Sequence, residues 1–149
     1  MKRDLVLKEV YAAPPALVWR ALTDPALLKE WLMDNDFSPV VGARCQFRMK
    51  PQPGFSGVVN CEVLEVDEPR RLVYTWHGGG RWGKTTVAWT LKPTAAGTEL
   101  TLEHRGFDGF LPFILSLMMG SGWKKKLSGK LADIVARLTR DQQSAAAIG

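Results

Sequence analysis

The chain has 149 residues, of which 46% are hydrophobic and 23% charged, and its formal net charge is +5. This length suits one domain with a sizeable core, and the proportions are those of an ordinary soluble globular protein. The densest basic run is Lys124-Lys125-Lys126. We interpret it as a solvated helix face rather than a nucleic-acid site, with an anionic membrane surface or an acidic partner as the alternative.

No segment predicts a membrane span, a secretory leader or a metal centre. The N-terminal residues lack an apolar signal core, and the longest apolar stretch, Phe110 to Met119, is too short to cross a bilayer. We therefore expect a cytoplasmic protein in which Cys45 and Cys61 stay reduced. Two His and two Cys without metal-ligand spacing argue against structural zinc, and no motif implies a cofactor.

The first predicted elements are one strand and two short helices. Leu5 and Leu7 alternate within residues 4–11, as in a strand. Pro15 suits the first turn of a helix that continues through "ALVWRAL". Asp24 is a good N-cap for a second short helix, "PALLKEWL".

From about Phe37 to Arg105 the pattern is β throughout. Apolar and polar side chains alternate in five segments, which are separated by turn sequences rich in Pro and Gly. Strands joined in series by tight turns predict an antiparallel meander. Because each segment has one apolar and one polar face, only one side of the sheet should be covered.

The hairpin around Pro53 makes a specific prediction about the two cysteines. Cys45 and Cys61 are equally distant from Pro53 in the sequence, so a symmetric hairpin places them opposite each other. We expect both to be buried thiols.

The C-terminal part, to about Arg140, is predicted to be helical, with apolar residues recurring every three or four positions from Trp123 to Leu138. Gly120, Ser121 and Gly122 interrupt this region, either as a break before the main helix or as a mobile gate, because glycine weakens a helix by about 1 kcal/mol. Residues 141–149 have little to bury and are expected to form a disordered tail after a single domain, 1–140.

Several local sequences carry a family resemblance. The segments "APPALVWRALTDPALLKEWL", "VGARCQF", "VLEVDEPRRLVYTW" and "TVAWTLKPTAAGTELTLEHRGF", with Trp123, resemble START-like (SRPBCC) proteins related to the C-terminal domain of the Hsp90 ATPase activator. The resemblance runs from about Leu5 to Leu138. It implies the helix-grip fold, an α+β domain whose curved six-stranded antiparallel sheet wraps a long C-terminal helix, with two short helices between strands one and two. Members of that superfamily include lipid carriers, polyketide cyclases, antibiotic-sequestering proteins and co-chaperone domains.

A curved sheet covered by one helix leaves volume for an apolar cavity. We expect a cavity between the sheet and a helix that starts near Gly122, holding a small hydrophobic or aromatic ligand. Plain core packing is the alternative for every candidate lining residue. The candidates are Phe47, Cys61, Trp76, Val87, Trp89, Leu102 and His104 on the sheet, with Leu115, Met118 and Met119 on the helix.

His104 is the inward-facing polar candidate, because it alternates with Leu100 and Leu102. A buried histidine can satisfy a hydrogen bond, contact a ligand or transfer protons. The sequence thus leaves three functions open: a binding protein, a cyclase or hydrolase that uses His104, and an Hsp90-type co-chaperone domain. The eukaryotic activators have an additional N-terminal domain that these 149 residues do not show, which argues against chaperone activation. A homodimer is also left open.

Overall fold

A computed structural model describes residues 2–79, 83–108 and 110–148, and it describes only the backbone of residues 2, 3, 110–118, 147 and 148. It contains seven strands and four helices within those ranges. The elements in chain order are β1 (Lys2–Tyr11), α1 (Pro15–Thr23), α2 (Pro25–Trp31), β2 (Asp34–Asn35), β3 (Arg44–Arg48), β4 (Val58–Asp67), β5 (Arg71–His77), β6 (Lys84–Thr94), β7 (Gly97–Asp108), α3 (Phe110–Ser128) and α4 (Lys130–Ile148).

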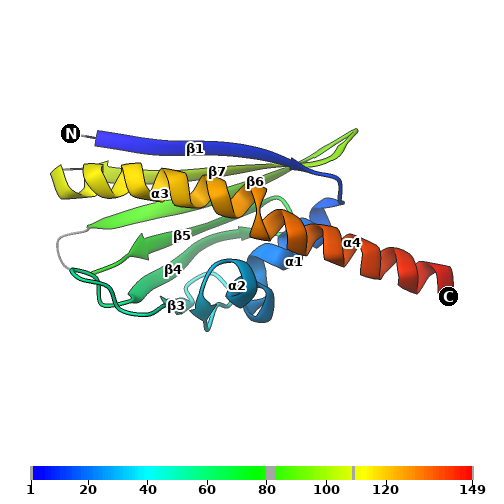
Figure 1. The fold of residues 1–149 in the computed structure, drawn as a ribbon, viewed down its shortest axis with the longest axis horizontal. Helices are drawn as coiled ribbons and strands as arrows, with labels where there is room; N and C mark the ends of the chain where they lie inside the picture. The colour runs from blue at the N-terminus through cyan, green and yellow to red at the C-terminus, as the bar shows by residue number, and fades with distance from the viewer. Residues whose placement is uncertain (1, 80–82, 109, 149) are drawn as a thin grey trace.

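The strands form one antiparallel sheet in the order β1-β7-β6-β5-β4-β3-β2. The first strand therefore pairs with the last, and the strands from β2 to β7 follow one another as a meander. Helix α3 lies across the sheet, α1 and α2 lie beside it, and α4 continues past the sheet to the C-terminus (Figure 1). This arrangement confirms the predicted α+β helix-grip fold.

The two short helices begin as their sequences predict. Pro15 occupies the first turn of α1, where a missing N–H leaves no partner unsatisfied. The side chain of Asp24 caps α2 by accepting a hydrogen bond from the backbone N–H of Ala26 at 2.9 Å. Leu28 and Trp31 of α2 are fully buried, so the helix packs its apolar face inward.

The sheet has one strand more than the six predicted. The additional strand, β2, consists of two residues that pair with Arg48 and Phe47 of β3. Its sequence, Asp34-Asn35, has no apolar alternation and indicates a turn. Here register with β3, rather than strand propensity, determines the pairing.

The helical region breaks at Gly129, so the prediction of a break at residues 120–122 is wrong. Helix α3 starts at Phe110 and includes Gly120 and Gly122 without interruption. Trp123 and Leu127 are buried on this helix, and their packing outweighs the weak helix propensity of the two glycines.

The predicted disordered tail is also helical, since α4 extends to Ile148. Residues 141–146 are exposed, as their composition implies. Gln142, Gln143, Ala145 and Ala146 have high helix propensity, which favours the continuation of α4 through these exposed positions.

The cysteine prediction is confirmed in its geometry. Cys45 pairs directly with Cys61 across the β3–β4 hairpin, and both thiols are buried. Burial raises the pKa of both thiols. These groups are accordingly unreactive parts of the core.

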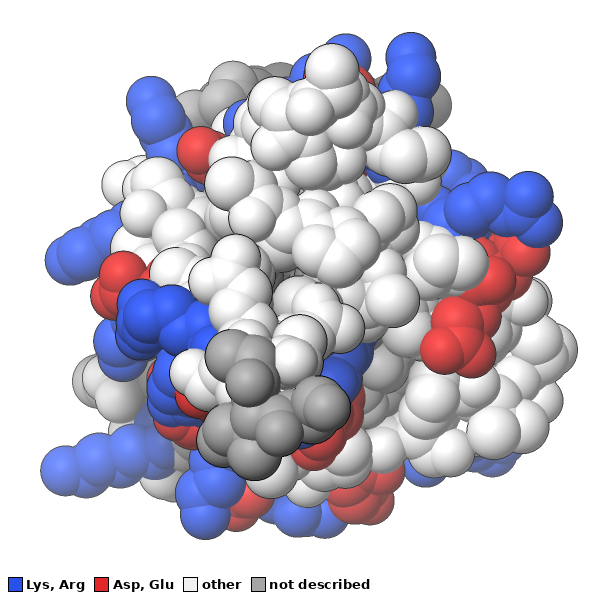
Figure 2. Space-filling view, turned by 90° about the vertical axis from the view of Figure 1, so that its right-hand side faces the viewer, with Lys and Arg blue, Asp and Glu red and all other residues white. Residues whose placement is uncertain are grey.

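Basic side chains are spread over the molecule. On the face that Figure 2 shows, Lys and Arg lie around the periphery with Asp and Glu between them. Several of these charges are paired, for example Arg137 of α4 with Glu30 of α2 at 2.8 Å. That face therefore presents no continuous basic patch among the described residues.

Candidate functional site

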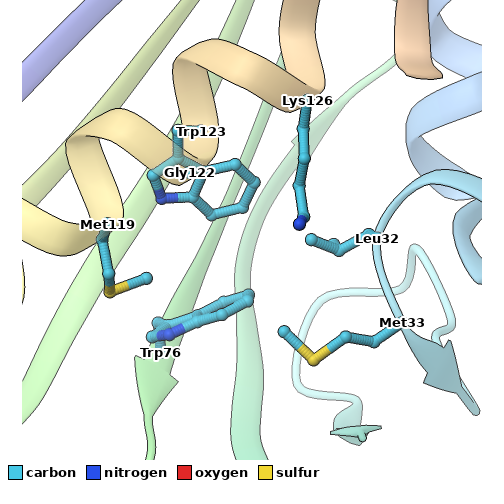
Figure 3. A pocket seen from close by; sticks show the side chains of 7 residues that line it. All are labelled: Leu32, Met33, Trp76, Met119, Gly122, Trp123 and Lys126. Atoms are coloured by element: carbon cyan, nitrogen blue, oxygen red, sulfur yellow. The ribbon is translucent and has the colours of Figure 1, made fainter. Parts of the chain in front are cut away.

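Two neighbouring hollows open between helix α3, the loop after α2 and the sheet. The first, which we call the helix hollow, has a volume of about 250 Å³ (Figure 3). The second, the hairpin hollow, has a volume of about 360 Å³. The described residues around the helix hollow are Leu32, Met33, Trp76, Met119, Gly122, Trp123 and Lys126. Those around the hairpin hollow are Met33, Met49, Gln52, Pro53, Phe55, Val59, Trp76, Gly78, Gly83, Thr85 and Met119.

Among the described residues, three side chains border both hollows: Met33, Trp76 and Met119. Met33 follows α2, Trp76 comes from β5 and Met119 comes from α3. In Figure 3 the two thioethers flank the indole ring of Trp76. Methionine is unbranched and adapts to irregular shapes, so the boundary between the hollows consists largely of adjustable side chains.

A series of buried hydrogen bonds connects Trp123 to Trp76 through His104 and Thr85. The indole N–H of Trp123 donates to Nδ1 of His104 at 3.0 Å. The other ring nitrogen of His104 lies 2.7 Å from Oγ1 of Thr85. The Thr85 hydroxyl itself donates to the backbone oxygen of Trp76 at 2.9 Å.

These hydrogen bonds determine the protonation state of the His104 ring. An indole N–H can only donate, so Nδ1 must be the acceptor. The single hydroxyl proton of Thr85 goes to Trp76, so Nε2 of His104 must carry the ring proton and donate it to Thr85. The ring is therefore neutral and fully satisfied, and burial lowers its pKa to about 3.

The structure places few of the predicted lining residues at the hollows. Trp76 and Met119 border both hollows. Five other candidates are at most 1% exposed and pack in the core without bordering either hollow: Phe47, Val87, Trp89, Leu102 and His104. Cys61 instead packs against Cys45 in the hairpin. The side chains of Leu115 and Met118 lie outside the described part of the chain.

The sequence interpretation missed Leu32, Met33, Phe55 and Lys126. The position of Lys126 could have been predicted from the sequence, because it follows Trp123 by three positions and Gly122 by four, a spacing that puts all three on one helix face. Leu32 and Met33 continue the apolar sequence of α2 beyond its last turn. Phe55 lies in a Pro- and Gly-rich turn, where no periodic signal exists.

Lys126 is the charged residue at the helix hollow. It is half-buried, and burial is the main effect that lowers the pKa of its ammonium group, followed by the positive charges of Lys130 and Lys125. No ion pair is found for Lys126 within the described ranges. Its positive charge therefore lies beside apolar side chains without a compensating carboxylate.

Within residues 2–79, 83–108 and 110–148 no group of three or more His, Cys, Asp or Glu side chains is arranged to hold a metal ion. No described helix is long and apolar enough to cross a membrane.

Comparisons with known proteins support this architecture. Residues 12–136 match the family model described as "Activator of Hsp90 ATPase homolog 1-like protein". Among curated proteins no match is found.

Solved structures resemble the chain over most of its length. Protein MLL2253 from Mesorhizobium loti is 35% identical, with a TM-score of 0.81 over 91% of this chain and 98% of that one. Protein BH1534 from Bacillus halodurans is 27% identical, with a TM-score of 0.74 over 91% and 99%. DynU16, described as a protein of the dynemicin biosynthetic locus, is 25% identical, with a TM-score of 0.71 over 89% of this chain and 47% of that one.

Proposed function

Because the chain belongs to the Activator of Hsp90 ATPase homolog 1-like family, whose fold is used for ligand binding, we propose that it binds a small hydrophobic or aromatic molecule in the helix hollow and the hairpin hollow. The observation that carries this proposal is the pair of apolar hollows meeting at Trp76. Concave apolar sites with few polar groups are typical of small-molecule binding. Each Å² of apolar ligand surface buried there contributes roughly 25 cal/mol.

Binding is favoured over catalysis by the position of His104. An enzyme acting in these hollows needs a titratable group that can reach the ligand. Both ring nitrogens of His104 are engaged by Trp123 and Thr85, and the ring does not border either hollow. Lys126 is the one titratable side chain among the described residues that border the hollows.

The test fills the hollows from helix α3. A Cβ atom placed on Gly122 meets no atom within 4 Å, so Gly122→Leu should fill the helix hollow without distorting the helix. Met119→Trp adds volume where the two hollows meet. Ala136→Leu, at an exposed position of α4, is the matched control for added hydrophobicity.

The probe is a neutral fluorescent aromatic amine, N-phenyl-1-naphthylamine. We expect it to bind the unaltered protein and the Ala136→Leu control alike, and to bind Gly122→Leu and Met119→Trp at least tenfold more weakly. Circular dichroism and thermal unfolding confirm that each variant folds. If the unaltered protein does not bind the probe, or if both filled variants bind it normally, the small-molecule proposal fails and a protein-interaction role takes its place.

A further inference from the structure

We infer that the ligand is an elongated amphipathic carboxylate, whose head group lies at Lys126 and whose hydrocarbon chain runs through the helix hollow into the hairpin hollow. This inference rests on the proposed function and specifies its ligand class. It follows from the placement of one charge beside two neighbouring apolar hollows that share Met33, Trp76 and Met119.

The first step concerns the environment of Lys126. Figure 3 shows its side chain extending from α3 toward Leu32, with Trp123 beside it and the Trp76 ring below. These three neighbours are apolar where they face Lys126. The charged residues that act on its ammonium group, Lys125 and Lys130, are positive. The ammonium therefore gains little from its protein neighbours.

An anionic group at this point would remove that deficit. A carboxylate within hydrogen-bond distance of an ammonium forms a charge-assisted bond, which is roughly twice as strong as a neutral one. Arginine residues at other positions already have such partners, for example Arg105 with Asp4 at 3.1 Å. The half-buried ammonium of Lys126 has the same requirement, and the ligand can meet it.

The second step concerns the body of the ligand. Beyond Lys126, the described lining of the helix hollow consists of apolar side chains and one glycine. The hairpin hollow is larger, and its described lining carries no charged side chain. Its two polar members are Gln52 and Thr85, and the Thr85 hydroxyl is already engaged by Trp76 and His104. This space accordingly suits a hydrocarbon chain and offers no site for a second charge.

The third step concerns the connection between the hollows. Met33 and Met119 border both of them. Each has three rotatable side-chain bonds and is half-buried. Rotation of either thioether would open a passage beside Trp76, through which a flexible chain could extend from one hollow to the other.

An alternative role for Lys126 is purely structural. Long cationic side chains often cover apolar surface with their methylene groups while the charge remains in water. Lys126→Met keeps this coverage and removes the charge, so it separates the two roles. Lys125→Met removes an equal charge from the exposed neighbouring position and serves as the matched control.

The experiment compares dodecanoate with dodecanol, which have equal chain lengths, by displacement of the neutral fluorescent probe at pH 7.5 in low salt. We expect the unaltered protein to bind dodecanoate roughly tenfold more tightly than dodecanol. Lys126→Met should abolish this preference by weakening the binding of dodecanoate to the level of dodecanol. Lys125→Met and Lys126→Arg should retain the preference.

Equal binding of the acid and the alcohol by the unaltered protein would overturn the inference. So would equal weakening of dodecanoate by the two Met variants, which would indicate a general charge effect. In both cases continued binding of dodecanol leaves the proposed function intact. If neither compound displaces the probe and the probe itself does not bind, the proposed function fails as well.

Discussion

The buried histidine predicts a definite pH dependence of stability. In the folded protein the pKa of His104 lies near 3 because the ring is buried and neutral, whereas in the unfolded chain an unperturbed histidine has a pKa of about 6.5. Between these values the unfolded state binds the proton and the folded state does not. The free energy of unfolding therefore falls as the pH falls through this range.

The magnitude follows from the slope. One proton difference corresponds to about 1.4 kcal/mol per pH unit. Lowering the pH from 7.5 to 5.0 should thus decrease the free energy of unfolding by about 2 kcal/mol through His104 alone. At pH 5.0 most carboxyl groups are still ionised, since their usual pKa values are about 4, so they add little to this change.

The assay is urea denaturation at pH 7.5 and pH 5.0, followed by tryptophan fluorescence. His104→Gln removes the titrating group and should remove the 2 kcal/mol difference, although its stability at pH 7.5 will be lower because Trp123 and Thr85 lose their ring partner. His77→Gln is the control that retains His104 and should retain the difference. If His104→Gln proves too unstable, an NMR titration of the unaltered protein should show no protonation of His104 down to pH 5. A His104 signal that titrates near pH 6.5 would refute the reasoning.

Three further predictions concern stability and reactivity. Gly122→Ala should stabilise the protein by about 1 kcal/mol and raise the melting temperature by about 2–4 °C, because the added Cβ enters open space within a helix. Gly129→Ala should lower the melting temperature, because the added Cβ would lie 2.8 Å from a backbone oxygen. Tyr11→Phe should cost about 1–3 kcal/mol in urea denaturation, because it leaves a buried carbonyl of α3 without the hydroxyl that donates to it at 2.7 Å. Cys45 and Cys61 should resist alkylation by iodoacetamide at pH 8 until the protein unfolds, because both thiols are buried and their pKa values are raised; rapid labelling of the native protein, measured by mass spectrometry, would contradict their burial.

Sequence periodicity predicted those parts of the fold where one side chain in two, or one in three or four, is buried. The alternation in β3 and β4 placed Cys45 opposite Cys61, and the alternation in β7 turned His104 inward. Such patterns report the direction of a side chain relative to the sheet. They do not report whether the space in front of that side chain is filled.

This limit explains why several predicted lining residues lie away from the two hollows. Phe47, Trp89 and Leu102 do face inward, but all three are at most 1% exposed. The Trp89 ring, for example, packs against Trp123 with ring centroids 5.6 Å apart. The space remains open nearer the β3–β4 hairpin, where Met33 and the turn residues lie. Residues in turns, and residues just after a helix, show no hydrophobic periodicity. Whether they line a hollow depends on tertiary packing, which local sequence patterns do not report.

The hydrogen bonds from Trp123 to His104, and through Thr85 to Trp76, fix one part of the lining of the helix hollow more firmly than the rest. The indole rings of Trp76 and Trp123 lie 5.5 Å apart, edge to face, and displacing Trp123 would strand a buried ring nitrogen. Met33 and Met119, which flank the Trp76 ring in Figure 3, can instead change rotamer at little cost. The tryptophan surface of the helix hollow is thus fixed and the methionine surface is adjustable, so molecules that fit it should share the shape that contacts the tryptophans and differ where they contact the methionines.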